Sequence, residues 1–149
     1  MFFIKRLLLV CALCYATPTN VILTFDDGWT DHFAVSEKLD QYNLKGTFYI
    51  NSARVGKTQR MTLEQLHTLA DRGHEIAAHT KTHFRLTDQP YDTQEREICG
   101  DREKLLKWGF NVTSFAYPYG ADTTESYDIL AKCGFNSARD SGGIRTNTR

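Results

Sequence analysis

The chain has 149 residues, which is enough for one globular domain and too few for two substantial cores. Apolar residues make up 41%, and 18 basic residues balance 18 acidic ones, as in an ordinary folded protein. This balance excludes the strongly basic surface that nucleic-acid binding requires, and no like-charge run predicts a charged tail.

The first sixteen residues are typical of a secretory signal peptide. Lys5 and Arg6 precede an apolar run over residues 7–13, and Ala16 suits a cleavage position. The run is shorter than the roughly 20 apolar residues that a membrane span needs. A buried first strand or helix is the alternative. The pattern predicts a secreted protein whose domain covers residues 17–149, with no membrane contact once the leader is removed.

Cysteine usage is consistent with secretion but does not decide the redox state. Cys11 and Cys14 lie in the predicted leader, so Cys99 and Cys133 remain in the domain. Two cysteines in an oxidising compartment can pair, but their sequence positions do not give their distance. Pairing and non-pairing therefore stay equally open at this point.

From residue 21 onward, short β-rich runs alternate with longer amphipathic stretches, each closed by turn residues. Capping-box patterns at Thr62–Gln65 and Asp92–Glu95 predict two of the helix starts. The predicted strands are 21–25, 47–50, 75–78, 113–116 and 135–138, and the predicted helices are 33–42, 62–72, 92–108 and 127–133.

This alternation predicts an α/β fold with a parallel sheet and right-handed crossovers. In such folds the ligand site lies at the carboxyl ends of the strands. Polar residues do follow the predicted strands: Asp26 and Asp27 follow the first, His79 the third, and residues 117–120 the fourth. These residues are therefore candidates for one shared site.

The two carboxylates and a histidine pair together predict a metal site. On their own, Asp26 and Asp27 before Gly28 also fit a simple turn, because Asp-Gly is a common turn dipeptide. His79 and His83, however, are spaced so that a helix or tight turn places both imidazoles on one side. Two imidazoles and one carboxylate suit catalytic Zn²⁺, and also Co²⁺, Mn²⁺ or Ni²⁺.

These residues resemble the motifs of the NodB-homology polysaccharide deacetylases. The likeness rests on Thr24–Gly28, on His79 and His83 with Thr80 between them, on Gly73–Ile76 and on Phe115–Gly120. It extends over residues 21–139. It implies a distorted (β/α) barrel and a hydrolase that removes N- or O-acetyl groups from glycans such as chitin, peptidoglycan or xylan.

The resemblance also implies roles for individual residues. Asp26 would be the general base, and Asp27, His79 and His83 would bind one divalent metal, with Zn²⁺ expected first. The metal would activate water and polarise the acetyl carbonyl. The backbone N–H of Tyr119 would stabilise the oxyanion, a contribution worth roughly 3 kcal/mol. A nearby cation would hold Asp26 ionised.

Two departures from the family pattern stand out. The family often has an arginine that orients the base at the position of Ala116, and a later histidine that serves as general acid, whereas no histidine follows His83. We therefore expect the last barrel strands to be missing. A catalytically impaired glycan-binding fragment is the alternative function, and a hydrolase of small amides is a third.

Four further residues have weaker assignments. His74 precedes a strand and is expected to be structural. Trp29, in the loop beyond the aspartates, could stack on a sugar ring, although a packing role is as reasonable. Tyr49 and Asn51 follow a strand and could line the same cleft. The sequence does not indicate an oligomeric state.

Overall fold

The computed structural model describes residues 20–142, so the predicted leader, residues 1–16, lies outside the described part. The core of the fold is one sheet of five parallel strands, arranged in chain order. The strands are β1 (Leu23–Phe25), β2 (Gly46–Ile50), β3 (Glu75–Ala78), β4 (Ser114–Ala116) and β5 (Ser137–Arg139).

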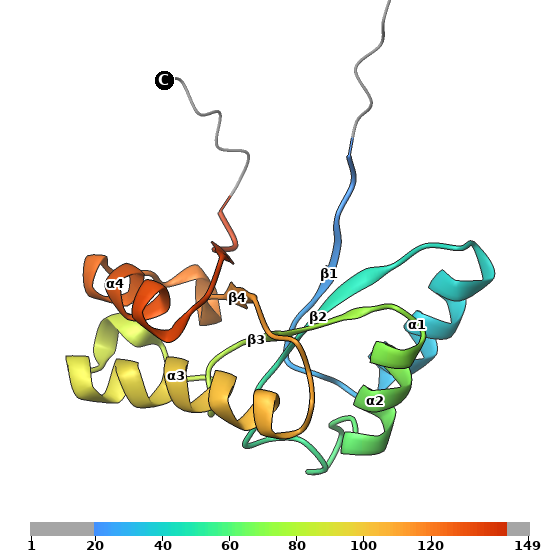
Figure 1. Ribbon diagram of the computed structural model, residues 1–149, viewed down its shortest axis with the longest axis horizontal. Coiled ribbons are helices and arrows are strands. Elements are labelled where there is room, and N and C mark those ends of the chain that lie inside the picture. The colour runs from blue at the N-terminus through green and yellow to red at the C-terminus, as the bar shows by residue number, and fades with distance from the viewer. Residues whose placement is uncertain (1–19, 143–149) are drawn as a thin grey trace, which may run out of the picture.

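A helix follows each of the first four strands, as the alternation predicted. The α-helices are α1 (Asp31–Gln41), α2 (Leu63–Asp71), α3 (Tyr91–Lys107) and α4 (Thr124–Cys133), with short 3₁₀ turns at η1 (Leu86–Asp88) and η2 (Pro118–Gly120). Helices α1 and α2 lie at one end of the molecule and α3 and α4 at the other (Figure 1). Within residues 20–142, none of the helices has the length and apolar composition of a membrane span.

The sheet curls into part of a barrel, which confirms the predicted (β/α)-barrel class. The core fills the space between sheet and helices, because β2 and β4 contribute the fully buried Phe48 and Phe115 while α2 and α3 contribute Leu66 and Ile98. Burying a side chain of this size contributes roughly 1.5–3 kcal/mol. Packing of this kind fixes the strands, and therefore the loops that follow them.

The helix starts show where local patterns succeed and fail. The capping box between Thr62 and Gln65 forms at α2, as predicted. The box expected at Asp92 is wrong, because α3 begins at Tyr91 after Pro90 and has no side-chain cap. Pro90, at the N-cap, has no N–H, so it leaves no additional donor without a partner at the helix start. Helix α4 starts three residues before the expected position, at a capping box around Thr123.

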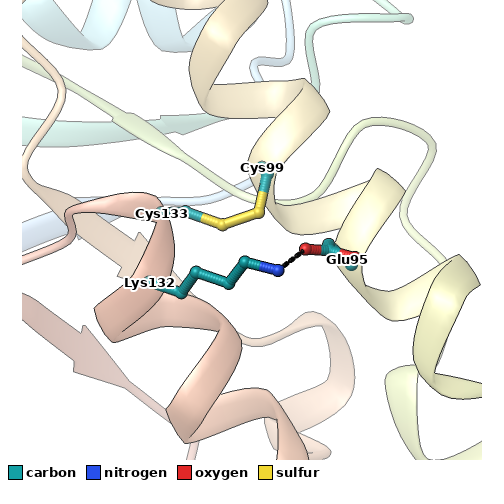
Figure 2. Close-up of a disulfide and its surroundings, with 4 residues drawn as sticks. All are labelled: Glu95, Cys99, Lys132 and Cys133. Atoms are coloured by element: carbon teal, nitrogen blue, oxygen red, sulfur yellow. Dashed lines mark hydrogen bonds and ion pairs between the residues drawn. A yellow bond between two sulfur atoms is a disulfide. The ribbon is translucent and has the colours of Figure 1, made fainter.

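Cys99 of α3 and Cys133 of α4 form a disulfide, which settles the question that the sequence left open (Figure 2). Their Cα atoms are 5.4 Å apart, within the usual range for such a bond. An ion pair between Lys132 and Glu95 joins the same two helices. Because β5 follows α4, these contacts tie the last strand to the rest of the domain.

Candidate active site

The polar residues picked out by the strand-end rule converge at the carboxyl edge of the sheet. Asp26 and Asp27 leave β1, His79 leaves β3, and the turn at residues 117–120 leaves β4. The prediction that these segments meet is correct. It holds because all five strands are parallel, so that their carboxyl ends lie at the same edge.

The turn after β1 has an unusual backbone at Asp27 and Gly28. Asp27 has a φ of 74° and Gly28 one of 63°, in the left-handed region that non-glycine residues rarely adopt. The Asp27 carbonyl accepts a hydrogen bond from Arg60 at 3.0 Å. A side chain at Gly28 would also press on Ile50, whose Cδ1 would lie 3.1 Å from an added Cβ. The local packing therefore holds this turn in one conformation.

Asp27, His79 and His83 come together as a possible metal site. One ligand atom from each lies within 4.8 Å of the others, and His83 Nε2 is 3.3 Å from Asp27 Oδ1. Asp27 Oδ1 is buried and has no hydrogen-bond partner among the described residues. A buried oxygen without a partner is costly unless something else neutralises it. This donor set fits a divalent cation.

Both imidazoles are prepared to act as neutral ligands. His79 Nδ1 lies 2.7 Å from the Ala116 carbonyl, which can only accept, so Nδ1 carries the proton and Nε2 is free. Burial lowers the pKa of His79, and burial likewise lowers the pKa of His83, against the opposing charge of Asp27. Neutral imidazole is the form that binds metal.

Asp26 has a different partner: a nearby cation was expected from the sequence, but it was not identified as Arg139. Its carboxylate pairs with the guanidinium of Arg139, at the end of β5. Arg139 is the register partner of Ala116, so the cation comes from the neighbouring strand at the level where the family motif has an arginine. The guanidinium also stacks over Tyr49, 4.5 Å from the ring centre. The strand-end rule could have marked Arg139 as a candidate, since it directly follows the predicted strand 135–138, but it does not give the pairing with Asp26.

Tyr119 borders the site through its ring as well as its backbone. It has a φ of 61°, and its ring meets His83 edge-on at 4.7 Å between centroids. Arg85 lies over the same ring at 4.7 Å. The side chain is 59% exposed, so it forms part of the rim of the site.

The structure places three of the more weakly assigned residues, His74, Asn51 and Trp29. His74 is buried and accepts the Gly46 N–H at Nδ1, so its role is structural. Asn51 is also buried, and its amide donates to the backbone carbonyl of His79, while the residue lines a small pocket beside Asp27. Trp29 is 37% exposed, and Arg60 covers its ring at 3.2 Å.

Comparison with known proteins agrees with this geometry. The YxkH protein of Bacillus subtilis is 30% identical over 118 residues, which is 77% of this chain and 42% of that protein. A peptidoglycan-N-acetylglucosamine deacetylase of Bacillus cereus is 30% identical over 115 residues, or 73% of this chain and 40% of the relative. The chain thus spans about two fifths of the length of these curated relatives.

The fold likewise matches a solved deacetylase. The structure of Streptococcus pyogenes deacetylase PplD in complex with acetate superposes with a TM-score of 0.74 at 26% identity, covering 76% of this chain and 52% of that one. The family model described as polysaccharide deacetylase matches residues 16–138, which is most of the chain. Sequence, fold and site agree that this chain belongs to the polysaccharide deacetylase family.

Proposed function

We propose that this protein is a metal-dependent hydrolase that removes acetyl groups from an acetylated polysaccharide such as chitin or peptidoglycan. The observation that carries the proposal is the placement of Asp27, His79 and His83 around one point, beside a separate Asp26–Arg139 pair. The three residues suit a metal ion, and Asp26 supplies a carboxylate that is not one of the proposed ligands.

Asp27, His79 and His83 would hold the metal, with Zn²⁺ expected and Co²⁺, Mn²⁺ or Ni²⁺ as alternatives. When bound, the metal would supply the Lewis acidity that activates water and polarises an acetyl carbonyl. The orphaned Asp27 oxygen and the free Nε2 of His79 support this assignment.

Asp26 would take the proton from the attacking water as general base. Arg139 pairs with this carboxylate and so holds it in place. The Tyr119 N–H would donate to the oxyanion that forms at the acetyl carbon. Two observations support this role: Tyr119 has a left-handed backbone, and its ring contacts that of His83.

The substrate class is supported by the relatives and by the N-terminal pattern. One curated relative is a peptidoglycan-N-acetylglucosamine deacetylase. The leader-like residues 1–16 support a location outside the cell, where glycan polymers occur. Together they favour an acetylated glycan over a small amide.

Acetate release tests the proposal directly. The purified protein would be stripped with a chelator, reloaded with Zn²⁺ or Co²⁺, and incubated with chitin oligomers, peptidoglycan or acetylxylan. We expect acetate from at least one polymer, only after reloading, and a loss of at least about 100-fold in Asp26→Asn. Asp71→Asn, an exposed carboxylate on α2, should behave as wild type.

The alternative outcomes are distinct. If the protein binds metal and glycan but releases no acetate from any polymer, the enzyme proposal is wrong and the glycan-binding alternative replaces it. If acetate appears only from small amides, the substrate assignment is wrong.

A further inference from the structure

The segment that joins the two histidines has a backbone that requires outside support. His79 to His83 forms a tight loop in which Thr80 has a φ of 60° and His83 one of 69°. Left-handed non-glycine residues cost of order 1–3 kcal/mol each and persist only where the surroundings enforce them. Contacts from neighbouring elements must therefore enforce the left-handed backbone at Thr80 and His83.

Glu97 of α3 makes the most extensive of these contacts. Its Oε2 accepts the Thr82 N–H at 2.7 Å, and its Oε1 accepts the Thr82 hydroxyl at 2.8 Å. Its own backbone carbonyl accepts the Lys81 N–H at 3.0 Å. One residue of α3 thus receives three hydrogen bonds from the centre of the loop.

Asp101, one helical turn further along α3, supports the start of the loop. It is fully buried, and its Oδ2 accepts the His79 N–H at 3.0 Å while its Oδ1 accepts the Ser52 N–H at 2.8 Å. His79 N–H is shared with the Ile50 carbonyl. Asp101 therefore links the chain after β2 to the chain after β3.

Stability alone gives little reason to bury two carboxylates here. Within residues 20–142 neither Glu97 nor Asp101 forms an ion pair, although both are less than a tenth exposed. Burying an acid is costly, and N–H donors offset only part of the cost. The two carboxylates do fix the backbone N–H groups of His79 and Thr82, which carry or adjoin the two imidazoles in the chain.

We infer that Glu97 and Asp101 are positioning residues that hold the His79–His83 loop in its strained, metal-binding form and so set the affinity of the metal site. This inference rests on the metal site of the proposed function. Groups that fix metal ligands from behind typically account for about 10- to 100-fold in metal affinity.

The hydrogen-bond pattern predicts which substitutions the site tolerates. In Glu97→Gln the amide oxygen can accept the Thr82 N–H while the amide NH₂ donates to the Thr82 hydroxyl, so both contacts survive. Glu97→Ala removes both. In Asp101→Asn an NH₂ group must face a backbone N–H, because both carboxylate oxygens accept from N–H donors.

The test is a Zn²⁺ competition titration on the full chain, with circular dichroism to confirm folding. We expect Glu97→Ala to weaken Zn²⁺ binding by about 10- to 100-fold, Asp101→Asn to weaken it clearly, and Glu97→Gln to restore it to within about threefold. Glu103→Ala, an exposed position on the same helix, is the matched control. A residue with a purely structural role would lower the melting temperature and leave the affinity of the folded protein unchanged.

The outcomes separate this inference from the proposed function. Wild-type affinity in folded Glu97→Ala overturns the positioning role while the metal site stands. No Zn²⁺ binding by wild type overturns both. If Glu97→Ala does not fold, Thr82→Val decides instead, because it removes the hydroxyl contact from the other side; unchanged affinity there overturns the inference.

Discussion

Arg139 reaches Asp26 from β5, whereas the family motif often has its arginine in β4, at the position of Ala116. Register partners on neighbouring parallel strands present side chains at the same height, so either strand can supply a cation to the same carboxylate. Ala116 keeps a role through its backbone, since its carbonyl orients His79.

Removal of the Arg139 charge should slow catalysis without affecting the metal site. Arg139→Ala should lower kcat/KM for acetate release by about 10- to 100-fold, because a charged hydrogen bond to Asp26 is worth about 1.5–3 kcal/mol. Arg139→Lys should retain part of this activity. Arg96→Ala, an exposed arginine of α3, is the control, and Zn²⁺ affinity should be unchanged in all three. Wild-type activity in Arg139→Ala would contradict the role of Arg139.

His74 should make stability depend on pH. Burial lowers its pKa from the ordinary value of 6.5, and its Nδ1 must stay unprotonated to accept the Gly46 N–H. The unfolded state therefore binds more protons below pH 6.5, so this histidine contributes stability above that pH which is lost as the pH falls.

Urea unfolding at pH 7 and at pH 5 measures this contribution. The loss of unfolding free energy between the two pH values should be smaller in His74→Asn, whose amide oxygen can still accept the Gly46 N–H. His67→Asn, at an exposed position, should show the wild-type loss. Equal losses in wild type and His74→Asn would rule out the contribution of His74.

At the level of whole elements, the sequence predicted the strand and helix order and the strand-end position of the site. Hydrophobic periodicity and turn residues are local, so they can be read from the chain. The Arg139–Asp26 pair and the buried acids behind the loop depend on which elements become neighbours, and no local pattern contains that information. The left-handed backbone at Thr80 could not be predicted from the sequence either, because threonine does not favour this conformation.

The disulfide between α3 and α4 should contribute measurably to stability. It closes a stretch of 34 residues, and loop-closure entropy predicts about 3–4 kcal/mol for that length. Reductant should therefore lower the urea midpoint of wild type but leave that of the Cys99→Ser/Cys133→Ser double variant unchanged. Identical wild-type curves with and without reductant would show that the bond does not contribute.

Reduction should also affect catalysis through β5. Because α4 leads into the strand that carries Arg139, a looser α4 should disturb the Asp26–Arg139 pair more than the metal ligands. In the same reduced sample, acetate release should fall by a larger factor than Zn²⁺ affinity. Equal factors would contradict this role of α4.

At the level of the whole molecule, the curled parallel sheet explains why residues far apart in sequence form one site. Asp27 and His83 are 56 positions apart in the numbering, yet the parallel strands bring their side chains to 3.3 Å. The proposed metal ligands come from the loops after β1 and β3, and the proposed base, Asp26, is held from β5. The proposed division between metal ligands and base therefore rests on the fold as well as on the motifs.

The most direct test of this division is anomalous X-ray diffraction at the zinc edge, on crystals of the protein reloaded with Zn²⁺. We predict one ion bound by Asp27, His79 and His83, present in Asp26→Asn and lost in His79→Ala. An ion that takes Asp26 as a ligand, or that binds elsewhere on the molecule, would contradict the account.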